Sequence, residues 1–458
     1  MDFLTPSSRR AAGVAVRSRS APFAVLSVVV GLFAALPVTA ASGASVSSSI
    51  SQLEQSGSID AAKAAAARRA YIDARIVRRQ TSGSRRRAIS FQIRIAEGLA
   101  RGNRLTADRV TPVFTTLQNN ADWFASNGPA TAGTDRRFGR SRIIFQYFAG
   151  QGWEFHPLSN FAKLNAVWTV KSKPARRALG KYAHELLGWA VNRGGALTWE
   201  YYFPFSGSRA PFVSSISQGT AVQSLARAGN ALSDPVITAA AKQATQSFEV
   251  PAPVGLRLSA EEGYHYIGYS GNRRLRILNM FLQSLDGLHD YSTITDDQNA
   301  WNLYREGLKA ARRETAASDT GAWSLYSVGG AESSLHYHQL VTTFLSKLCG
   351  ETSEEIFCRT RTNFDQYTKQ PPQITAVTAR VRGRRVKVSF KLSKMSYVAV
   401  MAIKRGTSKN VGSAKALVGY GSRRFGFKKP KKGIYRVKVA ATDLAGNRNS
   451  ATIAVRVK

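Results

Sequence analysis

The sequence predicts a mainly α-helical protein, an incomplete (α/α) barrel or toroid with short strands, followed by a small all-β sandwich. Segments with the periodicity of amphipathic helices come in pairs between residues 59 and 348, with short strand-like stretches between them. Beyond Pro371-Pro372 the apolar residues recur at every second position, which is the period of a half-buried strand. The strands of the first part are too few and too short for a doubly wound sheet.

The length and the charge limit the kind of protein. A chain of 458 residues is long enough for two or three domains with sizeable cores. Its formal net charge of +37 requires an anionic partner or surface. The candidates are nucleic acid, anionic lipid and acidic polysaccharide.

Residues 1–44 have the layout of a secretory signal peptide or of a retained membrane anchor. Four arginines within the first 20 residues precede an almost wholly apolar run over 21–40, and small residues follow. About 20 apolar residues can span a bilayer, but Pro37 and the small residues favour cleavage. We therefore expect a secreted or extracytoplasmic cell-surface protein, and export argues against nucleic acid as its partner.

The two cysteines agree with export. Cys349 and Cys358 flank a short polar stretch, GETSEEIF, that can close into a local disulfide in an oxidising compartment. The chain has no further cysteine and its histidines are scattered, so we expect no metal site. No cofactor is expected either.

The chain then divides by composition. The stretch 41–58 is rich in Ser, Ala and Gly, and residues 45–58 are expected to be a flexible spacer. An N-terminal helical segment is expected over 59–140, with helices at 59–80, 84–101 and 106–125. The toroid is expected over 141–370, with helices at 160–170, 174–192, 212–228, 234–248, 275–291, 298–317 and 335–348, and strand-like stretches at 143–156, 197–205, 255–270 and 323–328.

The last segment, residues 371–458, is expected to be an antiparallel sandwich. Apolar residues alternate with polar ones over 386–392, 435–439 and 453–457. From Gln373 onward there are 22 Lys and Arg residues and one acid, Asp443. More than half of the net charge therefore lies here, and we expect an acidic polysaccharide or an anionic cell-surface polymer to bind this segment.

Four stretches in order carry a family resemblance. They are SQGTAVQSLARA over 217–228, LNMFLQSLDGLHD over 278–290, LYREG over 303–307, and DTG over 319–321 followed by Tyr326. Together they resemble the C-terminal domain of D-glucuronyl C5-epimerases, over roughly 145–364. The resemblance implies the same incomplete (α/α) barrel and an isomerase acting on uronate residues. The stretch GIYRVKVAATDLAGNR in the last segment resembles bacterial Ig-like modules.

C5 epimerisation of a uronate sets clear chemical requirements. A proton must leave the carbon next to a carboxylate and return on the opposite face, so two acid/base groups are needed. The intermediate carries a second negative charge, so the site must also neutralise the carboxylate.

The resemblance assigns catalytic candidates. Tyr269 and Tyr326 occupy the positions of two site tyrosines of the family. The chain departs from the family at Gly268, where a Glu is expected, and at Gly329, where an Arg is expected. The position of a third family tyrosine falls on Glu332, which could serve as base if burial raised its pKa.

Five further residues are candidates for binding substrate. Arg273 and Arg274 could meet the carboxylate, or could be solvated surface residues. Gln218 lies on the inward side of its helix, and such an amide either bonds neighbouring backbone or forms part of a polar site. Asn279 lies in a matched motif, and His336 starts a helix and is expected to face inward.

Three hypotheses remain open. The first is an epimerase-like enzyme. The second is a lyase, which shares the removal of the C5 proton, or a hydrolase, which needs two opposed carboxylates and for which the pair Glu262 and Glu332 is unconvincing. The third is a protein that binds polysaccharide without catalysis. The polysaccharide and the oligomeric state are not specified by the sequence.

Overall fold

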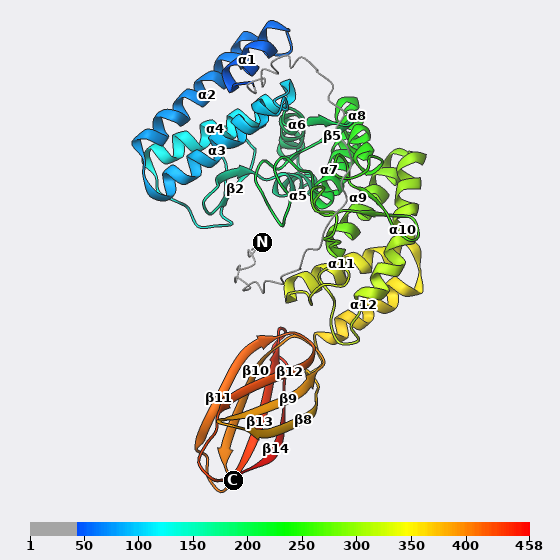
Figure 1. Ribbon diagram of the computed structural model, residues 1–458. Coiled ribbons are helices and arrows are strands. Elements are labelled where there is room, and N and C mark those ends of the chain that lie inside the picture. The colour runs from blue at the N-terminus through cyan, green and yellow to red at the C-terminus, as the bar shows by residue number, and fades with distance from the viewer. Residues whose placement is uncertain (1–43) are drawn as a thin grey trace, which may run out of the picture. The chain divides into compact units, whose positions relative to one another are not determined.

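The computed structural model describes residues 44–458 (Figure 1). The segment expected to be a signal peptide or anchor therefore lies almost wholly outside the described residues. In the described part, no helix combines the length and apolar character needed to cross a membrane. The described residues form two compact units, one of 44–138 with Phe145–Glu154 and one of Gly139–Ile144 with Phe155–Lys458.

The first unit is built from helices and a small sheet. Its helices are α1 (Val46–Gln55), α2 (Ala61–Gln80), α3 (Gly83–Arg101) and α4 (Ala107–Ser126), and its sheet has the order β1 (Asp135–Arg136), β2 (Phe145–Phe148), β3 (Gly152–Phe155). Helix α1 replaces the flexible spacer expected over 45–58. The Ser45 side chain accepts a hydrogen bond from Ser48 N and so caps the helix, and Val46 and Ile50 are buried one turn apart.

The second unit begins with helices in pairs. They are α5 (Pro157–Trp168) with α6 (Lys173–Leu187), α7 (Ser215–Leu232) with α8 (Pro235–Thr245), α9 (Leu278–Thr295) with α10 (Gln298–Ser318), and α11 (Leu335–Thr352) with α12 (Glu355–Tyr367). Helix α7 packs between α5 and α9, and α9 also packs on α11, so these four form an inner row (Figure 1). Each packs against the next helix in the chain. Two short hairpins lie between the pairs, β4 (Val191–Arg193) with β5 (Ala196–Thr198) and β6 (Arg257–Ser259) with β7 (Tyr264–Tyr266).

The prediction of a mainly helical protein with a C-terminal β-rich region is confirmed, and the helices described do not close into a barrel. The expected disulfide is also present, since Cys349 and Cys358 are bonded and join the last turn of α11 to the first turn of α12. Helix α12 itself was not expected from the sequence.

Glycines allow α7 and α9 to approach closely. A Cβ atom built on Gly219 would lie 2.7 Å from Ser284 Cα, and one on Gly287 would lie 2.2 Å from the Gly219 carbonyl oxygen. Real Cβ atoms do not approach backbone so closely, so only glycine fits at these two positions. Both belong to the motifs that carry the family resemblance.

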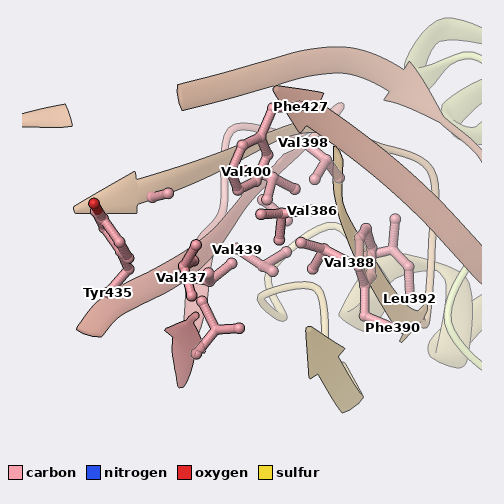
Figure 2. Packing of buried hydrophobic residues seen from close by; sticks show 14 residues of the cluster. Val386, Val388, Phe390, Leu392, Val398, Val400, Phe427, Tyr435, Val437 and Val439 are labelled. Atoms are coloured by element: carbon pink, nitrogen blue, oxygen red, sulfur yellow. The ribbon is translucent and has the colours of Figure 1, made fainter. Parts of the chain in front are cut away.

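The β-rich end is a sandwich of two sheets. One has the order β12 (Gly421–Lys428), β9 (Arg385–Leu392), β8 (Ile374–Arg382), and the other β11 (Asn410–Val418), β10 (Ser396–Lys404), β13 (Gly433–Asp443), β14 (Arg448–Val457). Figure 2 shows the inward side chains of both sheets meeting in one core, including Val386, Val388, Val400 and Val437. The period of two that the sequence displays is therefore the inward–outward alternation of these strands.

The connection between α12 and the sandwich is tied down by sandwich side chains. The Lys394 ammonium is 2% exposed and donates to the carbonyls of Tyr367 and Gln370, both at 2.6 Å. It also pairs with buried Asp443 at 3.1 Å. The Asn447 side chain donates to the Thr368 carbonyl at 2.8 Å. These bonds satisfy backbone groups of the linker that water would otherwise have to satisfy.

Candidate functional site

Four tyrosines from separate segments of the second unit gather at the N-terminal ends of the inner helices. Tyr201 follows β5, Tyr269 lies between β7 and α9, Tyr326 precedes α11, and Tyr337 is in the first turn of α11. We call these four residues the tyrosine cluster. Charges on the other three phenols would each act on Tyr269, so all three lie within electrostatic range of it.

A small apolar group forms the floor under the cluster. Ile216 on α7, Ile277 just before α9 and Met280 on α9 are buried, and the half-buried rings of Tyr269 and Tyr326 pack against them. The structure thus brings together the two tyrosines that the sequence selected, although 56 residues separate them in the chain.

The loop that carries Tyr326 is fixed by backbone hydrogen bonds. Tyr326 N donates to the Ala331 carbonyl at 2.8 Å, and its own carbonyl accepts from Leu278 N at the start of α9 at 3.3 Å. The Tyr326 ring packs against that of Tyr337, with centroids 5.0 Å apart and planes inclined at 56°. Tyr337 is therefore the direct partner of Tyr326.

The Tyr269 ring is held by two other aromatic rings. Its edge meets Phe205 at 5.5 Å and Phe212 at 5.8 Å between centroids. Ser206, the residue after Phe205, has a backbone φ of +45°. A non-glycine residue in this region is unusual and is found preferentially at functional sites.

The cluster raises the pKa of every one of its phenols. Burial is the main cause in each case, and it raises the pKa of Tyr201 to about 12 and that of Tyr269 well above its usual value. The pKa values of Tyr326 and Tyr337 are raised as well, again chiefly by burial. At neutral pH these groups are protonated and can donate protons, and any one of them that ionises is a strong base.

Hydrogen bonds and ring contacts of the Asp-Thr-Gly turn and of His338 fix the segment that leads to Tyr326. Asp319 Oδ1 accepts hydrogen bonds from Gly321 N at 2.8 Å and from the Tyr367 hydroxyl at 3.1 Å. The buried His338 ring stacks on Trp323 with centroids 3.9 Å apart, and its Nδ1 accepts from Ser324 N at 3.2 Å. Burial lowers the pKa of His338 to about 4, so the ring is neutral near pH 7. The motif residues thus position the loop rather than reach the cluster.

The carboxylate of Glu332 lies at the junction with the sandwich. Its two oxygens accept hydrogen bonds from Met395 N at 2.7 Å and Tyr420 N at 2.8 Å. Burial raises the pKa of Glu332, while these two amides act in the opposite direction. The structure does not bring this carboxylate into contact with the tyrosine cluster.

The two predicted amides have different surroundings. Gln218 is fully buried, accepts from Trp199 N at 3.1 Å and donates to the Leu197 carbonyl and to Ser247 Oγ, so its side chain joins α7 to neighbouring segments. Asn279 is 3% exposed beside Met280 of the floor, and its Oδ1 has no hydrogen-bond partner among the described residues. Buried polar atoms are nearly always paired, so Asn279 is the one of these two amides with an unsatisfied acceptor.

The other three predicted substrate-binding residues are all at the surface, including His336, which was expected to face inward. Arg273 and Arg274 are exposed in the turn that leads from Tyr269 to Leu275, which packs on the floor. His336 is exposed, with its ring centroid 5.6 Å from that of Tyr337. The described residues contain no group of three or more His, Cys, Asp or Glu side chains that could hold a metal ion.

The sequence analysis missed Tyr337 and Tyr201 as site residues. The signal for Tyr337 was available, because it lies directly after the candidate residue His336. Tyr201 carried no local signal, since its neighbours are aromatic too. It joins the cluster through a backbone bridge to Phe212 and a 2.6 Å hydroxyl contact with Ser217.

One family model matches the part of the chain that contains the tyrosine cluster. Residues 193–366, which contain all four tyrosines, match the family model described as D-glucuronyl C5-epimerase C-terminus. An uncharacterized protein of Methanocaldococcus jannaschii is 25% identical over 170 residues, which cover 36% of this chain and 55% of that protein. The chain therefore spans about half the length of this curated relative.

Two solved structures are also similar to parts of the chain. A D-mannose isomerase aligns with a TM-score of 0.37 at 10% identity, over 48% of this chain and 60% of that one. The cellobiose 2-epimerase from Spirochaeta thermophila aligns with a TM-score of 0.29 at 13% identity, over 44% of this chain and 55% of that one.

Proposed function

We propose, from the match of residues 193–366 to the D-glucuronyl C5-epimerase C-terminal family, that this protein is an exported carbohydrate epimerase acting on hexuronic acid residues of a polysaccharide. It would remove the C5 proton and return it on the other face of the sugar. One observation carries the proposal: Tyr269 and Tyr326, from distant segments, share one apolar floor with two further phenols beside them.

The residues divide the chemistry as follows. One phenol of the tyrosine cluster acts as base once ionised, and a protonated phenol on the other side of the sugar returns the proton. The buried acceptor of Asn279 takes a sugar hydroxyl, and Arg273 and Arg274 meet the substrate carboxylate. Glu332 accepts hydrogen bonds from two backbone amides of the sandwich, so we assign it a structural role and not that of the base.

The architecture is consistent with this function. The inner row of α5, α7, α9 and α11, each packed against the next helix, supports the assignment of an incomplete (α/α) barrel. The two packed sheets of the C-terminal region support the Ig-like assignment.

Export rests on a separate test. The disulfide between Cys349 and Cys358 supports an extracytoplasmic location, because such bonds persist in oxidising compartments. Intact mass of the secreted protein with and without reductant should differ by two hydrogens. Recovery of a two-thiol form under non-reducing conditions, or retention in the cytoplasm, would contradict this part.

A polysaccharide-binding protein without catalysis is the second candidate. Gly329, at the position where the family has an arginine, has no neighbouring atom within 4 Å of a built Cβ, so no side chain fills that space. If the exposed arginines do not replace the missing one, the second negative charge of the intermediate stays unneutralised and proton removal fails.

The test is incorporation of deuterium at C5 when uronate polymers are incubated with the full chain in deuterated water. An epimerase gains the label without unsaturated ends, whereas a lyase forms a double bond that absorbs in the ultraviolet, and a hydrolase shortens the polymer without either signal. Tyr326→Phe and Tyr269→Phe should abolish the label. Tyr264→Phe, whose ring lies under Arg257 outside the cluster, is the matched control and should keep it.

The outcomes separate the two candidates. If the chain binds several uronate polymers but labels none of them with deuterium, its function is polysaccharide binding without catalysis. Loss of folding in Tyr326→Phe, measured by thermal melting, would make that tyrosine structural, and Tyr269→Phe and Tyr337→Phe would then decide whether the cluster reacts.

A further inference from the structure

The outward side of the three-stranded sheet β12-β9-β8 carries a dense array of cations. Lys428, Arg385 and Arg382 are direct cross-strand neighbours in one row. Lys387 and Arg380 are neighbours in the next row, and Arg424 lies in the row beyond. All six side chains are exposed, and we call them the basic face; a seventh outward cation, Lys391, lies at the end of β9 opposite the neutral Ser422 and Thr375 and is not counted in it.

The core fixes the direction of these side chains. Val386, Val388 and Phe390 of β9 point into the sandwich (Figure 2) and are buried. Because successive residues of a strand point to opposite sides, the residues between them point outward. The cations of the basic face cannot turn inward without moving the apolar core to the surface.

The like charges of the basic face have no compensating acid in their own module. Asp443 is the one acidic residue from Gln373 onward, and it is buried against Lys394. Like charges directly opposite each other on a sheet are destabilising, and none of the six makes an ion pair within the described residues. An anionic ligand would remove this repulsion.

The other sheet lacks this concentration of charge. Its outward positions on β10 are Tyr397, Ala399, Met401 and Ile403, and its central pair of cations, Arg436 and Lys438, faces neutral residues on both neighbouring strands. The positive charge of the sandwich is thus unevenly arranged, with paired cations only on the basic face.

We infer that the basic face binds an acidic polysaccharide chain through its carboxylates. The outward positions beside the cations, Ser389, Thr378, Ser422 and Gly426, are small or hydroxyl-bearing. The face therefore has no aromatic ring on which nucleic-acid bases could stack and no apolar anchor for a membrane. Arginines paired across strands suit planar carboxylates, which accept two hydrogen bonds each from a guanidinium.

The choice of a uronate polymer rests on the proposed function, whereas the location of the site rests on the charge array alone. A polymer held here would stay near the tyrosine cluster between turnovers, because the site and the sandwich belong to one compact unit.

The experiment compares two triple variants of the full chain. Arg382→Gln, Lys387→Gln and Lys428→Gln remove half of the basic face, and Arg436→Gln, Lys438→Gln and Arg456→Gln remove the same charge from the other sheet. Affinity for polygalacturonate is measured by titration at sodium chloride concentrations between about 50 and 200 mM. Release of counterions from six contacts gives the parent chain an affinity loss of about 300-fold over this range, taking about 0.7 ions per contact.

The face variant should bind more weakly at low salt and lose only about 20-fold over the same range, since three contacts remain. The control triple should behave as the parent chain. Equal effects of both triples would overturn the proposal, because binding would then depend on total charge rather than on the face. Tighter binding to anionic phospholipid vesicles or to DNA than to polygalacturonate would overturn the ligand class.

Catalysis is tested separately from binding. Tyr326→Phe should retain the affinity and salt dependence of the parent chain, because it leaves the basic face intact. If binding depends on the basic face but no deuterium is exchanged, the proposed function is wrong and the binding site stands. If deuterium is exchanged but the face variant binds as tightly as the parent chain, the binding site is wrong and the proposed function stands. Melting curves of both triples check that they fold.

Discussion

The close approach of α7 and α9 gives a quantitative prediction for Gly287→Ala. The new Cβ would lie 2.2 Å from the Gly219 oxygen and 2.7 Å from its carbonyl carbon, and both are backbone atoms that cannot rotate away. Ordinary contact needs about 3.4 Å, so the two helices must separate. Overpacking of this kind costs about 1–3 kcal/mol, and the better helix propensity of alanine returns about 1 kcal/mol. Because both clashing atoms are backbone, we take the upper end of the overpacking range and expect a net loss of about 2 kcal/mol.

Chemical denaturation followed by circular dichroism measures this loss. Gly98→Ala is the matched control, because Gly98 lies within helix α3 and a Cβ there meets nothing within 4 Å. It should be neutral or stabilising by up to about 1 kcal/mol. The separation of α7 from α9 also displaces Ile216 from Met280 in the floor of the cluster, so C5 exchange should fall as well. A Gly287→Ala protein as stable as the parent would refute the packing argument.

Three further predictions concern charge. Burial lowers the pKa values of His338 and His156 to about 4, so on acidification these histidines bind protons in the unfolded chain before they do so in the folded one. The free energy of unfolding should therefore be full above about pH 6.5 and fall by about 3 kcal/mol per histidine as the pH drops toward 4, which urea unfolding at several pH values measures. Because the phenols of the tyrosine cluster have raised pKa values, the rate of C5 exchange should rise about tenfold per pH unit above neutrality, and a flat profile would exclude a phenolate base. Glu332→Ala leaves two backbone amides without acceptors and should lower the free energy of unfolding by about 2–4 kcal/mol. The exposed control Glu355→Ala should lower it by at most about 0.5 kcal/mol. If Glu332→Ala instead abolished C5 exchange without changing stability, Glu332 would be the base.

Periodicity predicted most elements because it reflects burial directly. The paired helices and the alternating strands are patterns within one segment, and the segment alone displays them. The same signal existed for α12, whose buried Phe357, Thr360, Phe364 and Tyr367 follow helical spacing, but the charged residues among them hid it. In α1 the two buried apolar residues, one turn apart, were hidden by serines.

The site was harder to predict because it depends on which segments meet. The family resemblance selected Tyr269 and Tyr326, and the structure places them on one floor. Tyr337 joins them through a ring contact with Tyr326 that no spacing displays. The position of Glu332 depends on how the sandwich packs against the preceding helices, and a residue count along the chain carries no such information.

The tied linker has a consequence for how the protein can be divided. Cutting the chain at Pro371-Pro372, where the sequence pattern changes, would remove the donors that Lys394 and Asn447 supply to the carbonyls of Tyr367 and Thr368. The separated sandwich would in turn keep a lysine whose carbonyl acceptors are gone. Neither fragment would then report the behaviour of its half in the intact protein, so substitutions in the full chain are the sound way to separate polymer binding from chemistry.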